Sequence, residues 1–129
     1  MAVRRPTVRE LNTLGVHFFR MGAHELALAQ FRAALRVLPT SAALHFNLGA
    51  CLFEMRRDVE AAEAFAAALQ DEPGHRGAHL YLGVSLARLG RGQEAIPHLR
   101  RVAAQDPAGE DGGLARATLA QIARESRAP

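Results

Sequence analysis

Apolar residues recur three or four positions apart along the chain, in segments that come in pairs. In the first pair, one segment holds Leu11, Leu14 and Phe18, and the other holds Leu28 and Phe31. This spacing puts the apolar side chains on one face of a helix. The pattern predicts helices over residues 8–21, 24–37, 42–55, 58–71, 76–89 and 92–105.

Residues typical of helix ends stand at several of these boundaries. Thr7 and Glu10 match a capping box, in which each side chain bonds the other residue's backbone N–H. Ser41 and Asp58 are expected as N-caps, because their side-chain oxygens can accept from free backbone N–H groups. Two glycines are expected to close helices or turns: Gly22 and Gly90.

The paired segments repeat with a period of 34 residues. Leu-Gly pairs stand at positions 14–15, 48–49 and 82–83, prolines at 39, 73 and 107, and alanines at 27, 61 and 95. Glycine inside a helix costs about 1 kcal/mol relative to alanine, so its recurrence needs a compensating reason. We expect the first helix of each pair to approach the second closely at the glycine, with the alanines keeping the facing surface small.

The composition fits an all-α fold. The chain has 26 Ala and 17 Leu but two Ile and seven Val, so the β-branched residues that favour strands are scarce. A length of 129 residues suits one domain, which we expect to span residues 1–129 and to be complete.

No run of 18 apolar residues and no signal-peptide pattern occurs, and Cys51 has no partner for an internal disulfide. We therefore expect a cytoplasmic protein that does not insert into membranes.

The period and its residues resemble the tetratricopeptide repeat (TPR), whose pattern is W-x2-L-G-x2-Y, A-x3-F and P. The first repeat reads Leu11-x2-Leu14-Gly15-x2-Phe18, then Ala27-x3-Phe31 and Pro39. The resemblance covers three repeats, 8–41, 42–75 and 76–109, although the leading Trp is absent and Leu99 replaces the aromatic residue of the third repeat. It implies a right-handed TPR solenoid, and the amphipathic segment 110–126 is expected to cap its C-terminal end.

The resemblance also implies a concave groove, lined by the first helix of each pair, in which TPR domains hold peptides. An apolar centre with arginines towards its edges is typical of peptide-binding hot spots. The alternative is that Phe46, Phe53 and Tyr81 pack between adjacent helices. The candidate peptide-binding residues are Asn12, Val16, Phe19, Arg20, Phe46, Asn47, Ala50, Phe53, Tyr81, Val84 and Arg88.

One specialised groove can be tested on the sequence. TPR domains that hold the C-terminal carboxylate of heat-shock chaperones use two Lys, two Asn and one Arg at fixed positions. The corresponding positions here are Asn12, Val16, Asn47, Gly77 and Tyr81. Because a carboxylate needs convergent charged donors, one match without a cation argues against that clamp.

Histidines and catalytic motifs add little further chemistry. His75 and His79 share a helical face, with His45 one repeat away, but such histidines more often cap or pack than bind zinc, so we expect no metal and no cofactor. His17 occupies the position of Cys51 and is expected to be buried between helices. No phosphate loop, nucleophile elbow or metal-hydrolase motif occurs, which argues against an enzyme.

These observations favour a non-catalytic interaction module that binds a peptide of another protein, as an adaptor or assembly scaffold. One alternative is a chaperone similar to the TPR chaperones of type III secretion, which also have three TPRs and an apolar groove. Those chaperones usually carry a longer N-terminal extension. Another alternative is a regulatory subunit of an enzyme or nucleic-acid complex that uses convex arginines. The net charge of +3 is weak support for nucleic acid, and self-association stays open.

Overall fold

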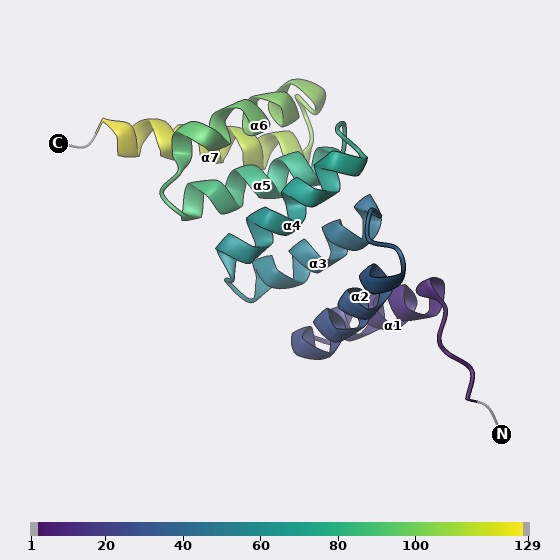
Figure 1. Ribbon diagram of the computed structural model, residues 1–129. Helices are drawn as coiled ribbons and strands as arrows, with labels where there is room; N and C mark the ends of the chain where they lie inside the picture. Colours follow the sequence, from purple (N-terminus) through teal and green to yellow (C-terminus); the bar gives the residue numbers. More distant parts are fainter. Residues whose placement is uncertain (1–2, 128–129) are drawn as a thin grey trace.

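The computed structural model describes residues 3–127, which form seven α-helices and no strand (Figure 1). The all-α class is confirmed, and every predicted helix is present to within one residue at each end. The helices are α1 (Val8–Arg20), α2 (His24–Val37), α3 (Ala42–Glu54), α4 (Asp58–Asp71), α5 (Arg76–Arg88), α6 (Gly92–Gln105) and α7 (Glu110–Ser126).

The helix ends follow the expected capping residues, with one exception. Thr7 and Glu10 form the capping box of α1, and Ser41 caps α3 by accepting from the Leu44 N–H at 3.2 Å. The assignment of Asp58 as an N-cap is wrong, because the N-cap of α4 is Arg57, whose side chain makes no capping bond. Asp58 is instead the first residue inside α4, where a carboxylate interacts favourably with the helix dipole.

The glycine at the middle of each first helix makes close packing within the pair possible. A Cβ on Gly15 would lie 2.5 Å from Cε1 of Phe31, and a Cβ on Gly49 would lie 2.7 Å from Cε1 of Phe65. Gly83 meets the Leu99 side chain in the same way. The expected close approach is confirmed, and the residue facing each glycine is the large apolar side chain of the second helix.

The pairs stack in sequence order, with the first helices in a row. α1 contacts α3, α3 contacts α5, and α5 contacts α7, whereas within residues 3–127 no Cα atom of α2 lies within 8 Å of α4, nor any of α4 within 8 Å of α6. A stack whose first helices touch and whose second helices splay apart is curved, with the first helices on its inner side. The core runs between the two rows, through buried residues such as Leu28, Phe31, Cys51, Phe65, Leu80 and Leu99.

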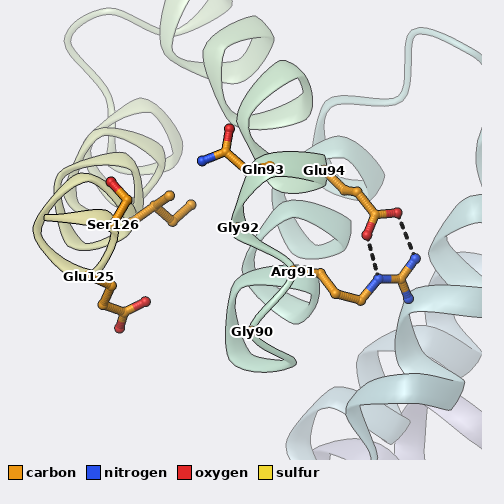
Figure 2. A pocket seen from close by; sticks show the side chains of 8 residues that line it. Gly90, Arg91, Gly92, Gln93, Glu94, Glu125 and Ser126 are labelled. Carbon is orange, nitrogen blue, oxygen red and sulfur yellow. Dashed lines mark hydrogen bonds and ion pairs between the residues drawn. The ribbon is translucent and has the colours of Figure 1, made fainter. Parts of the chain in front are cut away.

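The last helix, α7, lies against both α5 and α6 and covers this end of the stack (Figure 1). Ala115 and Ile122 on α7 are buried. Ile122 lies over Gly92, where a Cβ would come within 2.9 Å of its Cγ2, and a cleft of about 400 Å³ opens beside this contact (Figure 2). Figure 2 also shows Arg91 and Glu94 paired through two hydrogen bonds of 2.7 Å at the start of α6.

Two features of the backbone depart from regular helix. Pro97 is the sixth residue of α6, and α6 continues through it. The turn after each first helix contains a residue in the left-handed region, namely Gly22 (φ 77°), Arg56 (φ 59°) and Gly90 (φ 76°). Arg56 therefore adopts a conformation that glycine tolerates and arginine adopts at a cost.

No helix within residues 3–127 is both long and apolar enough to cross a lipid bilayer.

Candidate functional site

The inner side of the stack carries most of the candidate residues on α1, α3 and α5. On α1 and α3, Val16, Phe19, Ala50 and Phe53 are each half-buried, so part of each side chain faces solvent. We call this surface, from Val16 and Phe19 on α1 to Ala50 and Phe53 on α3, the groove floor. Phe19 also packs edge-on against His24 with ring centroids 5.6 Å apart.

A pair of asparagines joins the first two helices along this surface. Asn47 Nδ2 donates to Asn12 Oδ1 at 2.9 Å, and both side chains are half-buried. Each amide uses one of its four hydrogen-bonding positions in this bond. Asn12 keeps its Nδ2 donor and Asn47 keeps its Oδ1 acceptor, so adjacent helices present one donor and one acceptor side by side.

Phe46 packs between α3 and α5. Its ring stacks on His75 with centroids 4.7 Å apart and lies 5.6 Å from the Phe65 ring of α4. A Cβ on Gly77 would lie 2.9 Å from Phe46 Cε1, so the small residue at this position makes room for the ring. The contacts of Phe46 correspond to the alternative in which it packs between helices.

Phe53, Tyr81 and Arg88 form a second cluster between α3 and α5, and the Tyr81 ring joins it to the first cluster through a contact with Phe65 at 5.9 Å. The rings of Phe53 and Tyr81 meet edge to face at 5.1 Å, and the Arg88 guanidinium lies 3.9 Å from the centre of the Phe53 ring. Arg88 Nη1 also donates to Asp58 Oδ1 at 3.4 Å. Arg88 is held by a cation–π contact and an ion pair, which leaves less of its charge for a ligand.

Tyr81 is half-buried in this cluster. Burial raises the pKa of its phenol, and the nearby carboxylates of Asp111 and Glu54 act in the same direction. The phenol is therefore neutral at physiological pH and can donate or accept a hydrogen bond.

The inner face of α5 is largely closed by α7. Leu80 is fully buried and Val84 is only 9% exposed, so Val84 contributes to the core and offers little surface to a ligand. Arg76 at the start of α5 pairs with Asp111 of α7 at 3.2 Å. The accessible part of the candidate site therefore lies on α1 and α3.

The charges at this surface are distributed unevenly. Within residues 3–127, Arg9 and Arg20 of α1 have no carboxylate within ion-pair distance, whereas Arg76 and Arg88 of α5 are both paired. The two arginines on α1 are 11 residues apart, about three helical turns, which places them on one face of the helix.

His75 and Cys51 have structural roles, and His17 lies in a different environment from the one expected. His75 caps α5 by accepting from the Ala78 N–H through Nδ1 at 3.0 Å, and in the described part of the chain no cluster of three or more His, Cys, Asp or Glu could hold a metal ion. Cys51 is fully buried, and burial together with nearby Glu54 raises the pKa of its thiol to about 11, so it stays protonated. The expectation that His17 is buried is wrong: its side chain is exposed, and within residues 3–127 no helix packs over that side of α1.

Sequence reasoning did not find the contact between His79 and His98. The two Nδ1 atoms lie 2.9 Å apart although the residues are 19 positions apart in different helices. A helical repeat places such positions together, but only the packing of α5 on α6 reveals that two imidazoles meet there.

Comparison with protein families identifies the repeat. The tetratricopeptide repeat model matches residues 12–74 and 60–110. The chain belongs to the tetratricopeptide repeat family. No curated protein matches this TPR chain.

Solved TPR structures show the same fold at low sequence identity. The first TPR of Spaghetti (RPAP3) bound to the HSP90 peptide SRMEEVD has a TM-score of 0.86 and 18% identity, with 98% of each chain covered. The second TPR domain of human RPAP3 in complex with the HSP70 peptide SGPTIEEVD has a TM-score of 0.78 and 20% identity, covering 87% of this chain and 91% of that one. The Arabidopsis OM64 TPR domain has a TM-score of 0.82 and 16% identity, covering 89% and 93%.

Proposed function

We propose that this TPR protein is a non-catalytic interaction module that binds an internal, largely apolar peptide segment of a partner protein on the groove floor of α1 and α3. The observation that carries the proposal is the Asn12–Asn47 pair beside half-exposed apolar side chains. An extended peptide can donate a backbone N–H to Asn47 Oδ1 and accept from Asn12 Nδ2 with its C=O. Apolar side chains of the peptide then contact Val16 and Phe53.

The fold supports the proposal, since TPR domains of similar structure have been solved with bound peptides. The charges favour an internal segment over a free C-terminus. Arg76 and Arg88 are already paired with carboxylates, and a terminal carboxylate needs convergent cationic donors. Free Arg9 and Arg20 on α1 favour acidic residues at the flanks of the bound segment.

The proposal includes an adaptor or scaffold role in the cytoplasm, with the whole chain acting as one domain. The type III secretion chaperone and the convex-face regulatory subunit have no specific observation in their favour, and the proposal does not extend to them.

The experiment compares two substitutions of the same kind on opposite sides of the molecule. Ala50→Arg adds a long charged side chain to the groove floor and removes no contact seen in the structure. Ala66→Arg makes the same change at an exposed position of α4, on the outer row of helices. Both variants and the wild type are used to capture partners, and the captured proteins are scanned as overlapping peptides in a direct binding assay.

We expect Ala50→Arg to weaken peptide binding by at least ~10-fold, as is typical for a change at the centre of an interface, and Ala66→Arg to bind like the wild type. Equal binding by both variants would contradict the groove assignment. The peptide SRMEEVD is a second probe, because the absence of a cationic clamp predicts no saturable binding of its C-terminus.

A further inference from the structure

The first repeat exposes a face that a preceding helix covers in the later repeats (Figure 1). α2 packs on α3 and α4 packs on α5, but within residues 3–127 no helix lies on the corresponding side of α1 and α2. In the third repeat, the residues that line the cleft beside α4 include Leu82, Glu94 and His98. Their counterparts two repeats earlier form what we call the open face, together with His17: Leu14, Leu26 and Gln30.

The open face is more apolar than the same face of the later repeats. At its edge, the second and third repeats each carry an ion pair between an arginine and the glutamate three positions later. The first repeat holds Ala23 and Leu26 there, and Leu26 is 52% exposed. The terminal repeat of a solenoid normally turns polar residues to solvent, as α7 does at the other end with Arg116, Gln121 and Arg124. The composition of the open face therefore indicates that it is covered by a partner.

The shape of the open face fits a helix. A cleft of about 620 Å³ passes Leu14, His17 and Gln30. The counterparts of Leu14 and His17 in the second repeat are Leu48 and Cys51 on α3, the helix against which α2 packs. The same face thus receives a helix of 14 residues inside this molecule. A partner helix with apolar residues three or four positions apart can cover the open face in the same way.

Basic residues at one end of the open face determine the charge of the partner. Arg9 lines the cleft, and Arg36 lies in the last turn of α2, which ends beside the start of α1. Within residues 3–127 neither arginine has a carboxylate within ion-pair distance. The carboxylate at this end belongs to Glu10, which already accepts from Arg4 at 2.7 and 3.0 Å. A second copy that pairs through the same face brings no unpaired carboxylate, whereas an acidic partner pairs with both arginines.

We propose that the open face docks an amphipathic helix of a partner protein that has an apolar stripe and acidic residues in its C-terminal turn. The helix runs parallel to α2, so its last turn lies beside Arg9 and Arg36. Positive charge there attracts both its acidic side chains and the negative end of its helix dipole. The docking surface is separate from the groove floor, because Val16 is two residues from Leu14 and therefore about 200° away around α1.

The probe is a synthetic peptide of about 14 residues, stapled on its solvent side to keep it helical, with leucines alternately four and three residues apart and glutamates in its last turn. A second peptide carries lysines in place of the glutamates. Fluorescence anisotropy measures the binding of each peptide to the untagged chain. We expect saturable binding of the acidic peptide and at least ~10-fold weaker binding of the lysine peptide, because like charges then meet at the basic end.

Variants of the chain locate the bound peptide. Leu26→Gln should weaken binding of the acidic peptide at least ~10-fold, whereas Leu114→Gln, the same change at an exposed leucine of α7, should bind it like the wild type. Arg36→Gln should narrow the difference between the two peptides. Ala50→Arg, which obstructs the groove floor, should leave binding of the acidic peptide unchanged, so the result does not depend on the proposed function.

The proposal is wrong if neither peptide binds saturably, if both bind equally well, or if Leu26→Gln and Leu114→Gln weaken binding to the same extent. Analytical ultracentrifugation of the chain alone tests the other occupant of the open face. We expect a monomer at the concentrations of the binding assay. A dimer that Leu26→Gln dissociates would assign the open face to a second copy and overturn the proposal.

Discussion

The two ends of the solenoid carry the same repeat pattern and bury it to different extents. Leu14 in the first repeat is 41% exposed, and its equivalent Leu82 in the third repeat is 6% exposed. His17 is exposed where Ser85 is fully buried. Each first helix is covered by the repeat before it, and α1 has no such repeat within the described residues. Burial in a stacked array thus depends on the neighbour as much as on the residue.

The open end also carries a cleft of about 620 Å³, lined by Pro6, Arg9, Glu10, Leu11, Thr13, Leu14, His17 and Gln30. At the other end, α7 covers the third repeat and closes the inner face of α5. The accessible groove floor therefore lies on α1 and α3.

The largest expected difference between the ends comes from the repeated leucine. Leu82→Ala should lower the free energy of unfolding by about 3 kcal/mol, because it leaves a cavity in packed surroundings. Leu14→Ala should lower it by no more than about 1 kcal/mol, since part of the side chain is already in water. Chemical denaturation of both variants measures the difference. Equal losses would mean that the open end is covered in solution.

A smaller effect is expected at the position that holds His17, Cys51 and Ser85 in the three repeats. The Ser85 hydroxyl is buried without a hydrogen-bond partner within residues 3–127. Ser85→Ala should raise the free energy of unfolding by about 1 kcal/mol, and Cys51→Ser should lower it by about 1–2 kcal/mol by burying a second such hydroxyl. His17→Ser is the exposed control and should change it by less than about 0.5 kcal/mol. The reverse order among these variants would contradict the burial pattern.

The turn of the middle repeat differs from the turns of both outer repeats. Arg56 has a positive φ where the other repeats have Gly22 and Gly90. Arg56→Gly should stabilise the chain by about 0.5–1 kcal/mol, because relief of the left-handed strain outweighs the added freedom of the unfolded chain. Gly22→Ala is the matched reverse change and should lower the stability of the fold, because it places a side chain on a backbone of positive φ. Thermal unfolding of both variants tests whether the backbone of the three turns is equivalent.

The smallest expected effect concerns the start of α1. Hydrogen bonds from Arg4 and then from Thr7 lower the pKa of Glu10 to about 2 from a usual value near 4.5. A carboxyl with a lowered pKa in the folded state stabilises the fold above its unfolded pKa and loses this contribution as pH falls from 4.5 towards 2. Arg4→Ala should reduce the drop in melting temperature between pH 5 and pH 3 slightly, because Glu10 is exposed. An unchanged pH profile would show that the pair is not formed in solution.

Much of the fold follows from particular residues of the sequence. The 34-residue period, the Leu-Gly pairs and the capping residues predicted the first six helices, and the amphipathic pattern after Pro107 predicted α7. These features are local, since helix periodicity and capping depend on residues within one or two turns. The close packing of the paired helices at Gly15 and Gly49 could also be predicted from the sequence. Glycine within a helix indicates that a neighbouring helix approaches closely at that point.

The sequence predicted which residues make up the candidate site, but it predicted less well which of them are exposed. The sequence places Asn12, Asn47, Phe53 and Val84 at groove-facing positions of a TPR. The tertiary structure decided that Asn12 and Asn47 bond to each other, that Arg88 lies on Phe53, and that Val84 is buried. It also decided that His17 is exposed and that His79 meets His98.

What the sequence by itself determined is the repeat, its helices and the family. What only the tertiary structure decided is which copy of each repeated position is covered, because a side chain's burial and partners depend on the neighbouring helices that the stack brings against it.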